Sequence, residues 1–299
     1  ILCPAIADHF ELEEDRITIG QGSDDLLARL ARAFLGPKTE LIRSSTGYLK
    51  VPNYAYANDA SVISVPHNMF KTSVESILSG LTARTRLVYI ANPENPAGTY
   101  LKNAELRKIH SGLPSNVLLV VDAAYEEYVD ATDYETPCKL VEETNNVVVC
   151  KTFSKIFGLA GARIGWAYGP KEIIQSIKRI SLTFPVATPS IAAALSALED
   201  KNHTEYIFQN NKYGRAYLQT ELEALGLRTI PSQANFLLVN FPRKNKSAKS
   251  ADKFLLSKGI MVRRFAHSEY QDYLRITIGK KNELEKTIKT ISDFLINSV

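Results

Sequence analysis

The chain has 299 residues, of which 45% are hydrophobic and 23% are charged, and its formal net charge is +4 at pH 7. This length allows one large domain and a smaller one, with a sizeable core. The composition is ordinary for a globular protein, and the absence of any long apolar run or signal peptide in the sequence excludes a membrane protein.

The first predicted element is a helix that begins near Leu26, after the glycine-containing segment 20–25. One stripe of this helix is apolar and contains Leu26, Leu27, Leu30, Ala31 and Phe34. Glycines before a helix, with Ser23 as its N-cap, leave backbone N–H groups free to bind an anion. The same pattern is also typical of an ordinary turn and cap.

Three short apolar runs, at residues 87–91, 117–121 and 146–150, predict strands that are buried on both faces of a sheet. Segments with helical spacing lie between them, which is typical of an α/β fold. Ligands of such sheets bind at the carboxyl ends of the strands. Polar residues follow all three runs, so we expect them to converge on one crevice: Asn92 to Pro96, Asp122 to Tyr125, and Ser154 with Lys155.

Lys155 follows the third strand within the segment 152–163, which is rich in small residues and hydroxyls. Desolvation there would disfavour the ammonium form, lower the pKa of the lysine and free an amine that can form a Schiff base. Arg163, eight residues later, is suited to bind a phosphate bidentately. An isolated lysine is usually a solvated surface charge. The neighbouring polar strand ends favour the functional interpretation.

The other strand ends carry groups that suit the same chemistry. Asp122 can pair with a protonated ring nitrogen, or cap the segment that follows it. Tyr125 and Asn95 can hydrogen-bond a phenolate oxygen, or serve as a core aromatic and a turn residue. Tyr48 can stack on a ring, or simply pack. Together with Lys155 and a phosphate site, these groups match the needs of a pyridine aldehyde phosphate.

The character of the sequence changes after about residue 205. A helix, two strands and a final amphipathic helix with Asn282 as its N-cap are predicted there. The first three of these elements are residues 206–225, 236–240 and 273–278. The basic run 243–249 is predicted to be a solvated loop, and we expect no nucleic-acid partner. We predict a large domain of residues 1–205 and a small domain of residues 206–299.

Cysteine usage and the first residue bear on location and chain length. Cys3, Cys138 and Cys150 are odd in number and lack metal-ligand spacing, which indicates a reducing, cytoplasmic setting without disulfides. The five histidines form no close pair, so we expect no metal site. The chain begins with Ile1 rather than Met, which indicates a processed or truncated form, or numbering from a later residue.

With these residues in view, the chain resembles the class II aminotransferases, which are pyridoxal 5′-phosphate (PLP) enzymes of fold type I. The likeness is greatest to the histidinol-phosphate aminotransferases. It extends along the whole chain and is carried by residues 20–27, 92–100, 121–128, 152–166, 231–239 and 274–279. The resemblance implies an α/β fold, with a mostly parallel central sheet in a large domain and a smaller C-terminal α/β domain. It also implies a homodimer.

The resemblance also assigns roles around the cofactor. Lys155 would bind PLP and move the substrate's Cα proton. Asp122 would pair with the pyridine nitrogen, Tyr125 and Asn95 would hold the ring hydroxyl, and Tyr48 would stack on the ring. Five residues would surround the cofactor phosphate: Ser23, Asp24, Thr152, Ser154 and Arg163.

By the same resemblance, the substrates are small molecules. An amino group would pass between glutamate/2-oxoglutarate and histidinol phosphate/imidazole acetol phosphate, in histidine biosynthesis. Arg275 would bind the α-carboxylate of glutamate, because histidinol phosphate has none, and Arg263 would bind the distal phosphate. Alternatives are an aminotransferase for aromatic or other amino acids, a PLP-dependent decarboxylase of amino-acid phosphates, and a non-catalytic PLP-binding module.

The sequence departs from the family pattern at several points. Relatives have an N-terminal arm of several dozen residues that helps to close the site, and we expect this chain to start after it. Ala123 replaces the usual Glu after Asp122, and Ala97 replaces the usual Thr after Pro96. Residues 184–186 stand where relatives often have an asparagine near the substrate, which bears on the substrate more than on the cofactor.

Overall fold

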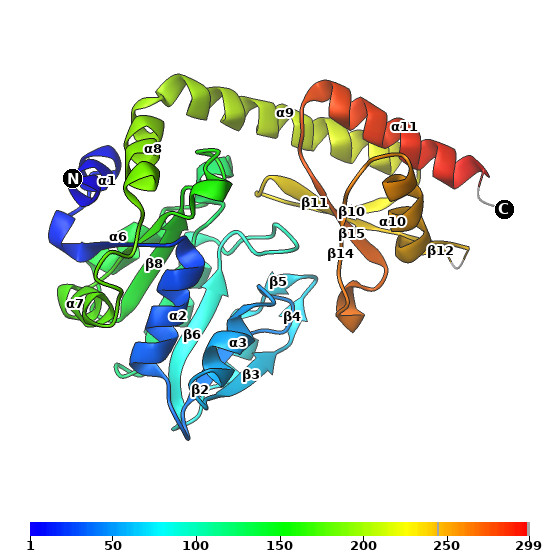
Figure 1. Ribbon diagram of the computed structural model, residues 1–299. Helices are drawn as coiled ribbons and strands as arrows, with labels where there is room; N and C mark the ends of the chain where they lie inside the picture. The colour runs from blue at the N-terminus through cyan, green and yellow to red at the C-terminus, as the bar shows by residue number, and fades with distance from the viewer. Residues whose placement is uncertain (244, 298–299) are drawn as a thin grey trace.

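Two sheets organise the computed structural model, which describes residues 1–243 and 245–297 (Figure 1). The larger sheet has seven strands in the order β1-β9-β8-β7-β6-β2-β3. Their bounds are β1 (Ile17–Gly20), β2 (Glu40–Ser44), β3 (Ser61–Val65), β6 (Thr85–Ala91), β7 (Leu118–Asp122), β8 (Val147–Thr152) and β9 (Gly165–Tyr168). Strands β3, β2, β6, β7 and β8 run parallel, whereas β9 is antiparallel to both of its neighbours. The strands predicted from the apolar runs and the mostly parallel sheet implied by the resemblance are confirmed.

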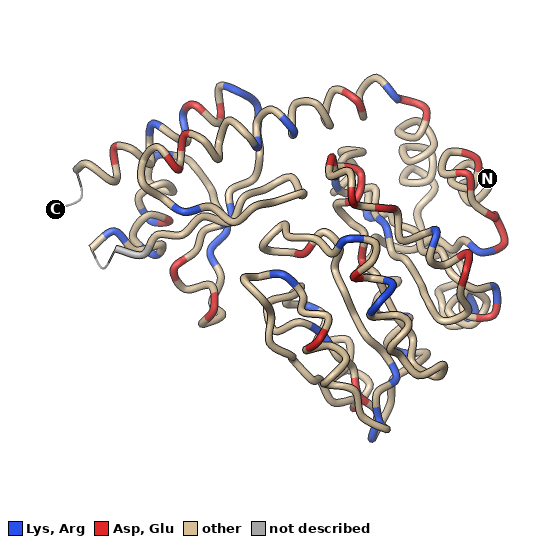
Figure 2. Tube along the Cα trace, turned by 180° about the vertical axis from the view of Figure 1, so that it is seen from behind, with Lys and Arg blue, Asp and Glu red and all other residues tan. Residues whose placement is uncertain are grey.

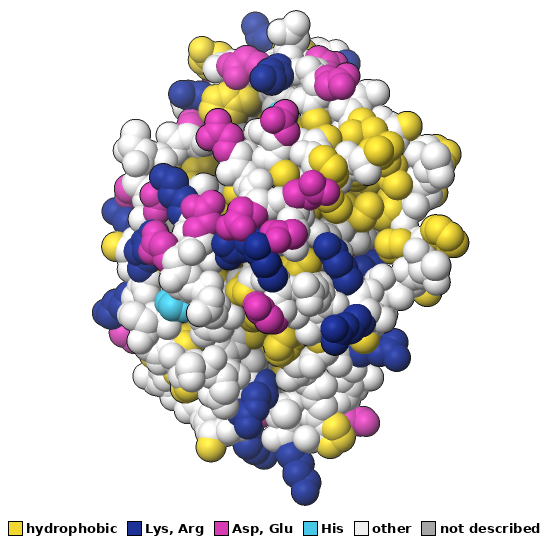
Figure 3. Space-filling view, turned by 90° about the vertical axis from the view of Figure 1, so that its left-hand side faces the viewer, with side chains coloured by type: hydrophobic (Ala, Val, Ile, Leu, Met, Phe, Trp, Pro, Cys, Tyr) yellow, Lys and Arg dark blue, Asp and Glu magenta, His cyan; other side chains and the backbone are white. Residues whose placement is uncertain are grey.

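Helices cover both faces of this sheet, because successive residues of each apolar strand point to opposite sides. In β6, Leu87 and Tyr89 join one core while Val88 and Ile90 join the other. One face is covered by α2 (Ser23–Phe34), α3 (Val51–Tyr56) and α7 (Lys171–Arg179). The other face is covered by α1 (Leu2–Phe10), α4 (Val74–Ser79), α5 (Asn103–Ser111), α6 (Pro137–Glu142) and α8 (Thr188–Glu199). Figure 3 shows the side that carries α1 and α8, where apolar side chains gather in a patch beside charged ones.

The C-terminal part of the chain forms a second, antiparallel sheet with the order β10-β11-β15-β14. Its strands are β10 (Arg228–Ile230), β11 (Phe236–Asn240), β14 (Arg263–Arg264) and β15 (Tyr273–Thr277). The helices α9 (Lys201–Ala224), α10 (Ala248–Ser257) and α11 (Lys281–Asn297) pack against it around a separate apolar core. The smaller α/β unit expected from the sequence is confirmed.

The long helix α9 belongs to both parts of the molecule, and Figures 1 and 2 show it extending from one to the other. Ile207 and Phe208, near its start, pack on the core of the large sheet. Leu218 and Leu222, near its end, lie in the core of the small sheet. The helix begins earlier than its apolar pattern predicts, because the Asp200 side chain caps it by accepting a 3.0 Å hydrogen bond from the backbone N–H of His203.

Two predicted helix caps are wrong. Ser23 is the first residue of α2 rather than its cap, and Gly22 occupies the cap position with a φ of 84°. Asn282 lies inside α11, which begins at Lys281. The helices therefore begin earlier than predicted, α2 by one residue and α11 by two, since a side chain that suits a cap is also tolerated in the first turn.

The basic run also differs from the predicted loop. Residues 242–243 and 246–247 form a short antiparallel pair, β12 and β13, and Ala248 begins α10. Lys244 of this run lies outside the described residues. Among the described helices, none has both the length and the apolar character required to cross a membrane.

Candidate active site

A cleft of about 410 Å³ lies where the parallel strands end and the small sheet begins. Every residue that the sequence analysis placed in the site lines this one cleft. They are Ser23, Asp24, Tyr48, Asn95, Asp122, Tyr125, Thr152, Ser154, Lys155, Arg163, Arg263 and Arg275. The convergence follows from the sheet, because β6, β7 and β8 are adjacent and parallel and therefore end at the same edge.

Asp122 forms the buried acidic end of the cleft. Its carboxylate accepts a 2.9 Å hydrogen bond from the Tyr89 hydroxyl and a 3.2 Å bond from the backbone N–H of Ala124. Burial raises the pKa of Asp122 to about 6, and the charge of Asp24 adds to this, while the bond from Tyr89 opposes it. A cationic N–H facing Asp122 would hold it ionised. A protonated pyridine ring has such a group, so this end of the cleft fits one.

Lys155 lies on the same cleft, where its Nζ is 5.1 Å from the centre of the Tyr125 ring. The lysine is half-buried, whereas Tyr125 is buried. The Tyr125 ring is itself held edge-to-face against Phe236 of β11, with ring centres 5.1 Å apart. The amine therefore faces a ring that contacts both sheets.

Arg163 and the start of α2 form a cradle for an anion. A Cβ atom on Gly22 would lie 2.5 Å from Arg163 Nη2, so only glycine lets the guanidinium approach the backbone here. Arg163 Nη1 donates to the Ala160 carbonyl at 2.8 Å and to Ser154 Oγ at 3.3 Å. Ser23 and Asp24, whose N–H groups at the start of α2 have no partner within the helix, line the same cleft. The residues present fit a phosphate group.

Asp24 points its carboxylate at two tyrosines rather than at this cradle. The Tyr54 hydroxyl donates to it at 2.7 Å and the Tyr48 hydroxyl at 3.5 Å. Burial and the Asp24 charge raise the pKa of Tyr48, which keeps its hydroxyl protonated. Asp24 thus fixes the position of Tyr48. The part played by Tyr54 was not predicted from the sequence.

Arg275 brings the small sheet to the edge of the cleft. Its Nη1 donates a 2.6 Å hydrogen bond to Asn95 Oδ1, and its guanidinium lies 4.6 Å from the centre of the Phe236 ring. Burial lowers the pKa of Arg275; Tyr125 opposes this shift and Arg263 adds to it. The buried Nε has no hydrogen-bond partner among the described residues. An anionic substrate group would satisfy this unpaired donor.

Glu94 is a buried carboxylate beside Asn95 that the sequence analysis missed. It accepts a 3.0 Å hydrogen bond from Thr72 Oγ1 and a 3.2 Å bond from the Asn95 N–H. Burial raises the pKa of Glu94 to about 7. A glutamate between prolines is typical of an exposed turn, so the sequence carries no signal of this burial.

Glu94 makes stability depend on pH. Its pKa is about 7 in the folded protein against 4.5 ordinarily, so the folded state binds the proton more tightly and stability falls as the pH rises between these values. We expect Glu94→Gln to raise the free energy of unfolding by up to about 3 kcal/mol above pH 8 and to leave it unchanged near pH 4. Urea unfolding at a series of pH values measures this difference. Parallel pH profiles of the two proteins would contradict it.

Among residues 1–243 and 245–297, no group of three or more His, Cys, Asp or Glu side chains is arranged to hold a metal ion.

Comparison with known proteins agrees with this geometry. The family model for aminotransferases of class I and II matches residues 2–291. The chain is 41% identical to histidinol-phosphate aminotransferase of Paramagnetospirillum magneticum over 292 residues, which cover 97% of this chain and 80% of that protein. It is 42% identical to histidinol-phosphate aminotransferase of Granulibacter bethesdensis over 291 residues, covering 97% and 78%.

A solved structure is also similar over nearly the whole fold. Histidinol-phosphate aminotransferase from Sinorhizobium meliloti, crystallised in complex with pyridoxal-5′-phosphate, superposes with a TM-score of 0.93 at 27% identity. The match covers 98% of this chain and 80% of that one. The chain belongs to the class I and II aminotransferases.

Proposed function

We propose that this chain is a PLP-dependent aminotransferase that passes an amino group between glutamate/2-oxoglutarate and histidinol phosphate/imidazole acetol phosphate, in histidine biosynthesis. The observation that carries the proposal is the placement of Lys155, Asp122 and Arg275 on one cleft. The relatives from P. magneticum and G. bethesdensis support the choice of substrates.

The cleft offers a site for each part of PLP. The cradle of Arg163, Ser154 and the α2 N-terminus would hold the phosphate, with Thr152 supporting Ser154 by accepting its N–H at 3.1 Å. Ser23 and Asp24 would contribute their backbone N–H groups there. Asp122 would hold the ring nitrogen protonated, while Asn95 and Tyr125 would contact the ring hydroxyl and Tyr48 would stack on the ring.

PLP supplies an aldehyde that condenses with amines and a ring that withdraws electrons from the substrate Cα. The chain's own groups then decide which bond breaks. Lys155 Nζ would take the proton from Cα and return it on the cofactor side as a general base and acid. Arg275 would hold the substrate carboxylate near the ring plane, which leaves the Cα–H bond perpendicular to the ring and favours proton loss over loss of CO₂.

Arg263 and Arg275 lie opposite each other on paired strands, β14 and β15. Arg263 is exposed, and its guanidinium is 5.7 Å from the centre of the Phe265 ring. Two guanidinium groups at one end of the cleft suit either a carboxylate of glutamate or the phosphate of histidinol phosphate. The same pair would thus serve both half-reactions.

We propose the same division of the chain as above, with a large domain of residues 1–205 and a small domain of residues 206–299, and a homodimer that works in the cytoplasm. Exposed apolar residues support a second copy as partner, because Ile180, Leu182 and Phe184 in the segment between α7 and α8 are open to solvent. The apolar patch of Figure 3 lies on the side of α1 and α8.

One experiment tests the substrate assignment. The purified protein is loaded with PLP and given histidinol phosphate and 2-oxoglutarate, and glutamate formation is measured. Histidine, phenylalanine and aspartate replace histidinol phosphate in parallel assays. We expect the highest kcat/KM with histidinol phosphate. Preference for an aromatic amino acid, release of CO₂, or cofactor binding without any spectral response to glutamate would each overturn the proposal in favour of one of the alternatives.

A further inference from the structure

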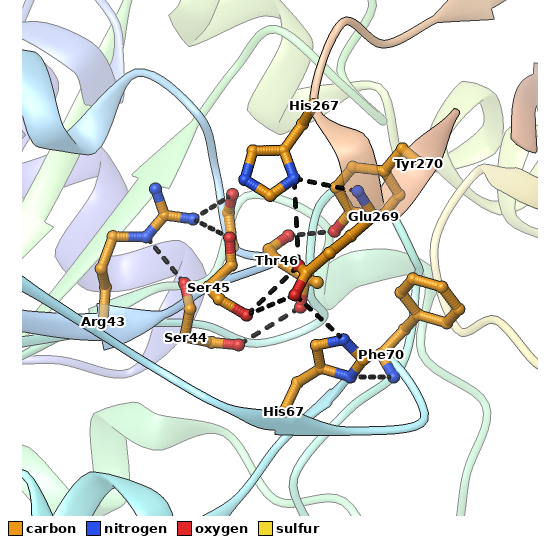
Figure 4. Close-up of polar contacts among 10 residues, drawn as sticks. Arg43, Ser44, Ser45, Thr46, His67, Phe70, His267, Glu269 and Tyr270 are labelled. Carbon is orange, nitrogen blue, oxygen red and sulfur yellow. Dashed lines mark hydrogen bonds and ion pairs between the residues drawn. The ribbon is translucent and has the colours of Figure 1, made fainter. Parts of the chain in front are cut away.

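A second contact joins the two parts of the molecule, outside the cleft. The segment 265–272 connects β14 to β15, and therefore lies between the two strands that carry Arg263 and Arg275. It contains η4 (Ser268–Tyr270), which reaches the loop after β2 and the hairpin of β4 (His67–Asn68) and β5 (Lys71–Thr72). We call Ser45, Thr46, His67, Glu269 and Tyr270 the interdomain latch; Figure 4 shows how these side chains face one another.

Tyr270 is the buried part of the latch. It is fully buried, and its hydroxyl donates a hydrogen bond to the backbone carbonyl of Thr46. Its ring packs against Phe265 with centres 5.2 Å apart and is stacked on Phe70 at 5.6 Å. Phe70 belongs to the large part of the molecule, so the tyrosine is held from both sides.

Glu269 is the charged part of the latch. Ser45 Oγ lies 3.3 Å from each of its carboxylate oxygens, and His67 Nε2 is 3.9 Å from Oε1. His67 Nδ1 accepts a 2.8 Å bond from the N–H of Phe70, which leaves the ring proton on Nε2, facing Glu269. His267 Nδ1 approaches the other oxygen at 3.9 Å. Glu269 therefore links the small part of the molecule to two segments of the large part, the loop after β2 and the β4–β5 hairpin (Figure 4).

The loop that receives the latch also carries part of the cofactor site. Buried Arg43 donates hydrogen bonds to the carbonyls of Ser44, Ser45 and Gly47, which fixes the loop shape up to Tyr48. One end of the contact is thus fixed relative to Tyr48, and the other end is fixed relative to Arg263 and Arg275. The distance between Tyr48, at the cofactor site, and the two arginines therefore depends on the contacts of the interdomain latch.

We propose that Glu269 and Tyr270 are positioning residues that set the two substrate-binding arginines over the cofactor site, and so determine affinity for anionic substrates without taking part in proton transfer. This inference deepens the proposed function and rests on it for the identity of the substrates. Asp130 of the large part also pairs with two residues of α9, with Arg215 Nη2 at 2.7 Å and with Lys212 Nζ at 3.8 Å, and neither pair involves the strands of the two arginines.

Glu269→Gln and Ser45→Ala test the latch from its two sides. In the PLP-loaded protein we expect each variant to weaken binding of glutarate, which has the carboxylates of glutamate but no amine, by about three- to fivefold. KM for glutamate should rise by the same factor, while kcat at saturation and the absorbance of the bound cofactor stay unchanged. Both substitutions remove the same contact, the one between Ser45 Oγ and the Glu269 carboxylate. The double variant should therefore weaken glutarate binding no more than either single variant.

Asp252→Asn is the matched control. Asp252 pairs with Arg264 of β14 at 3.3 Å, and both residues belong to the small part of the molecule. The substitution therefore removes an acidic partner of β14, the strand that also carries Arg263, and leaves the contacts of the interdomain latch intact. Glutarate affinity equal to that of the unmodified protein in Glu269→Gln and Ser45→Ala would overturn the inference, as would an equal weakening in Asp252→Asn. Glutarate binding is measured by calorimetric titration, which needs no turnover. Failure of this inference can therefore be distinguished from failure of the proposed function in the histidinol-phosphate assay.

Discussion

Lys155→Ala should lower turnover by about 10⁴-fold, because it removes the group that is placed to exchange the Cα proton. We expect the visible absorbance of the bound cofactor to disappear as well, since no other amine of the described residues lines the cleft beside Tyr125. Stopped assays with histidinol phosphate and 2-oxoglutarate, which follow the glutamate formed, together with absorption spectra, measure both effects.

Two controls define this result. Lys155→Arg keeps a positive charge near Tyr125 but supplies no free amine, so it should be as inactive as the alanine variant. Lys139→Ala removes an exposed lysine that pairs with Glu135 at 3.0 Å on the surface, and should leave activity unchanged. Full activity in Lys155→Ala would show that the proton is moved by another residue.

Lys151→Met should destabilise the fold by about 3–5 kcal/mol, since it leaves two buried carboxylates without their counter-ion. Lys151 Nζ lies 2.8 Å from both Glu126 Oε2 and Glu127 Oε1, and 4.6 Å from the centre of the Phe10 ring. Burial lowers the pKa of Lys151, but the two glutamates more than offset it and the net shift is upward. Urea unfolding followed by circular dichroism measures the loss.

The triple variant Glu126→Gln, Glu127→Gln, Lys151→Met is the control for this prediction. It removes the charges together, so most of the lost stability should return. Lys151 lies in β8, four residues before Lys155, and its two partners directly follow Tyr125. The ion pairs therefore also hold these two parts of the cleft together. Where the single variant still folds, we expect it to bind PLP more weakly. Equal stability of Lys151→Met and the unmodified protein would show that the two carboxylates are protonated or solvated.

Local sequence patterns predicted the central strands of the large sheet and the site residues at their ends. The apolar runs 87–91, 117–121 and 146–150 became β6, β7 and β8, and the polar residues at their ends line one cleft. Parallel strands made that convergence predictable, because neighbours end at the same edge. Helix starts were less certain: Ser23 suits a cap and a first turn equally well, and the positive φ of Gly22 decided between them.

Supporting residues were not predictable, because each acts over a long distance in sequence. Tyr89 sits in the middle of an apolar strand, where nothing marks its bond to Asp122. Glu94 resembles a turn residue but is buried. Ser45 and Glu269 are 224 positions apart, and no local pattern links them. The sequence thus predicts the residues that line the cleft better than it predicts the residues that position them through hydrogen bonds.

Because α9 is shared by both cores, its length also fixes the angle between the two parts. Each residue added to an α-helix turns everything beyond it by about 100° and advances it by about 1.5 Å. A single insertion between Phe208 and Leu218 would swing β14 and β15, with Arg263 and Arg275, out of line with the sheet edge that carries Lys155. The number of residues in α9 therefore determines where the arginines of the small part lie relative to Lys155.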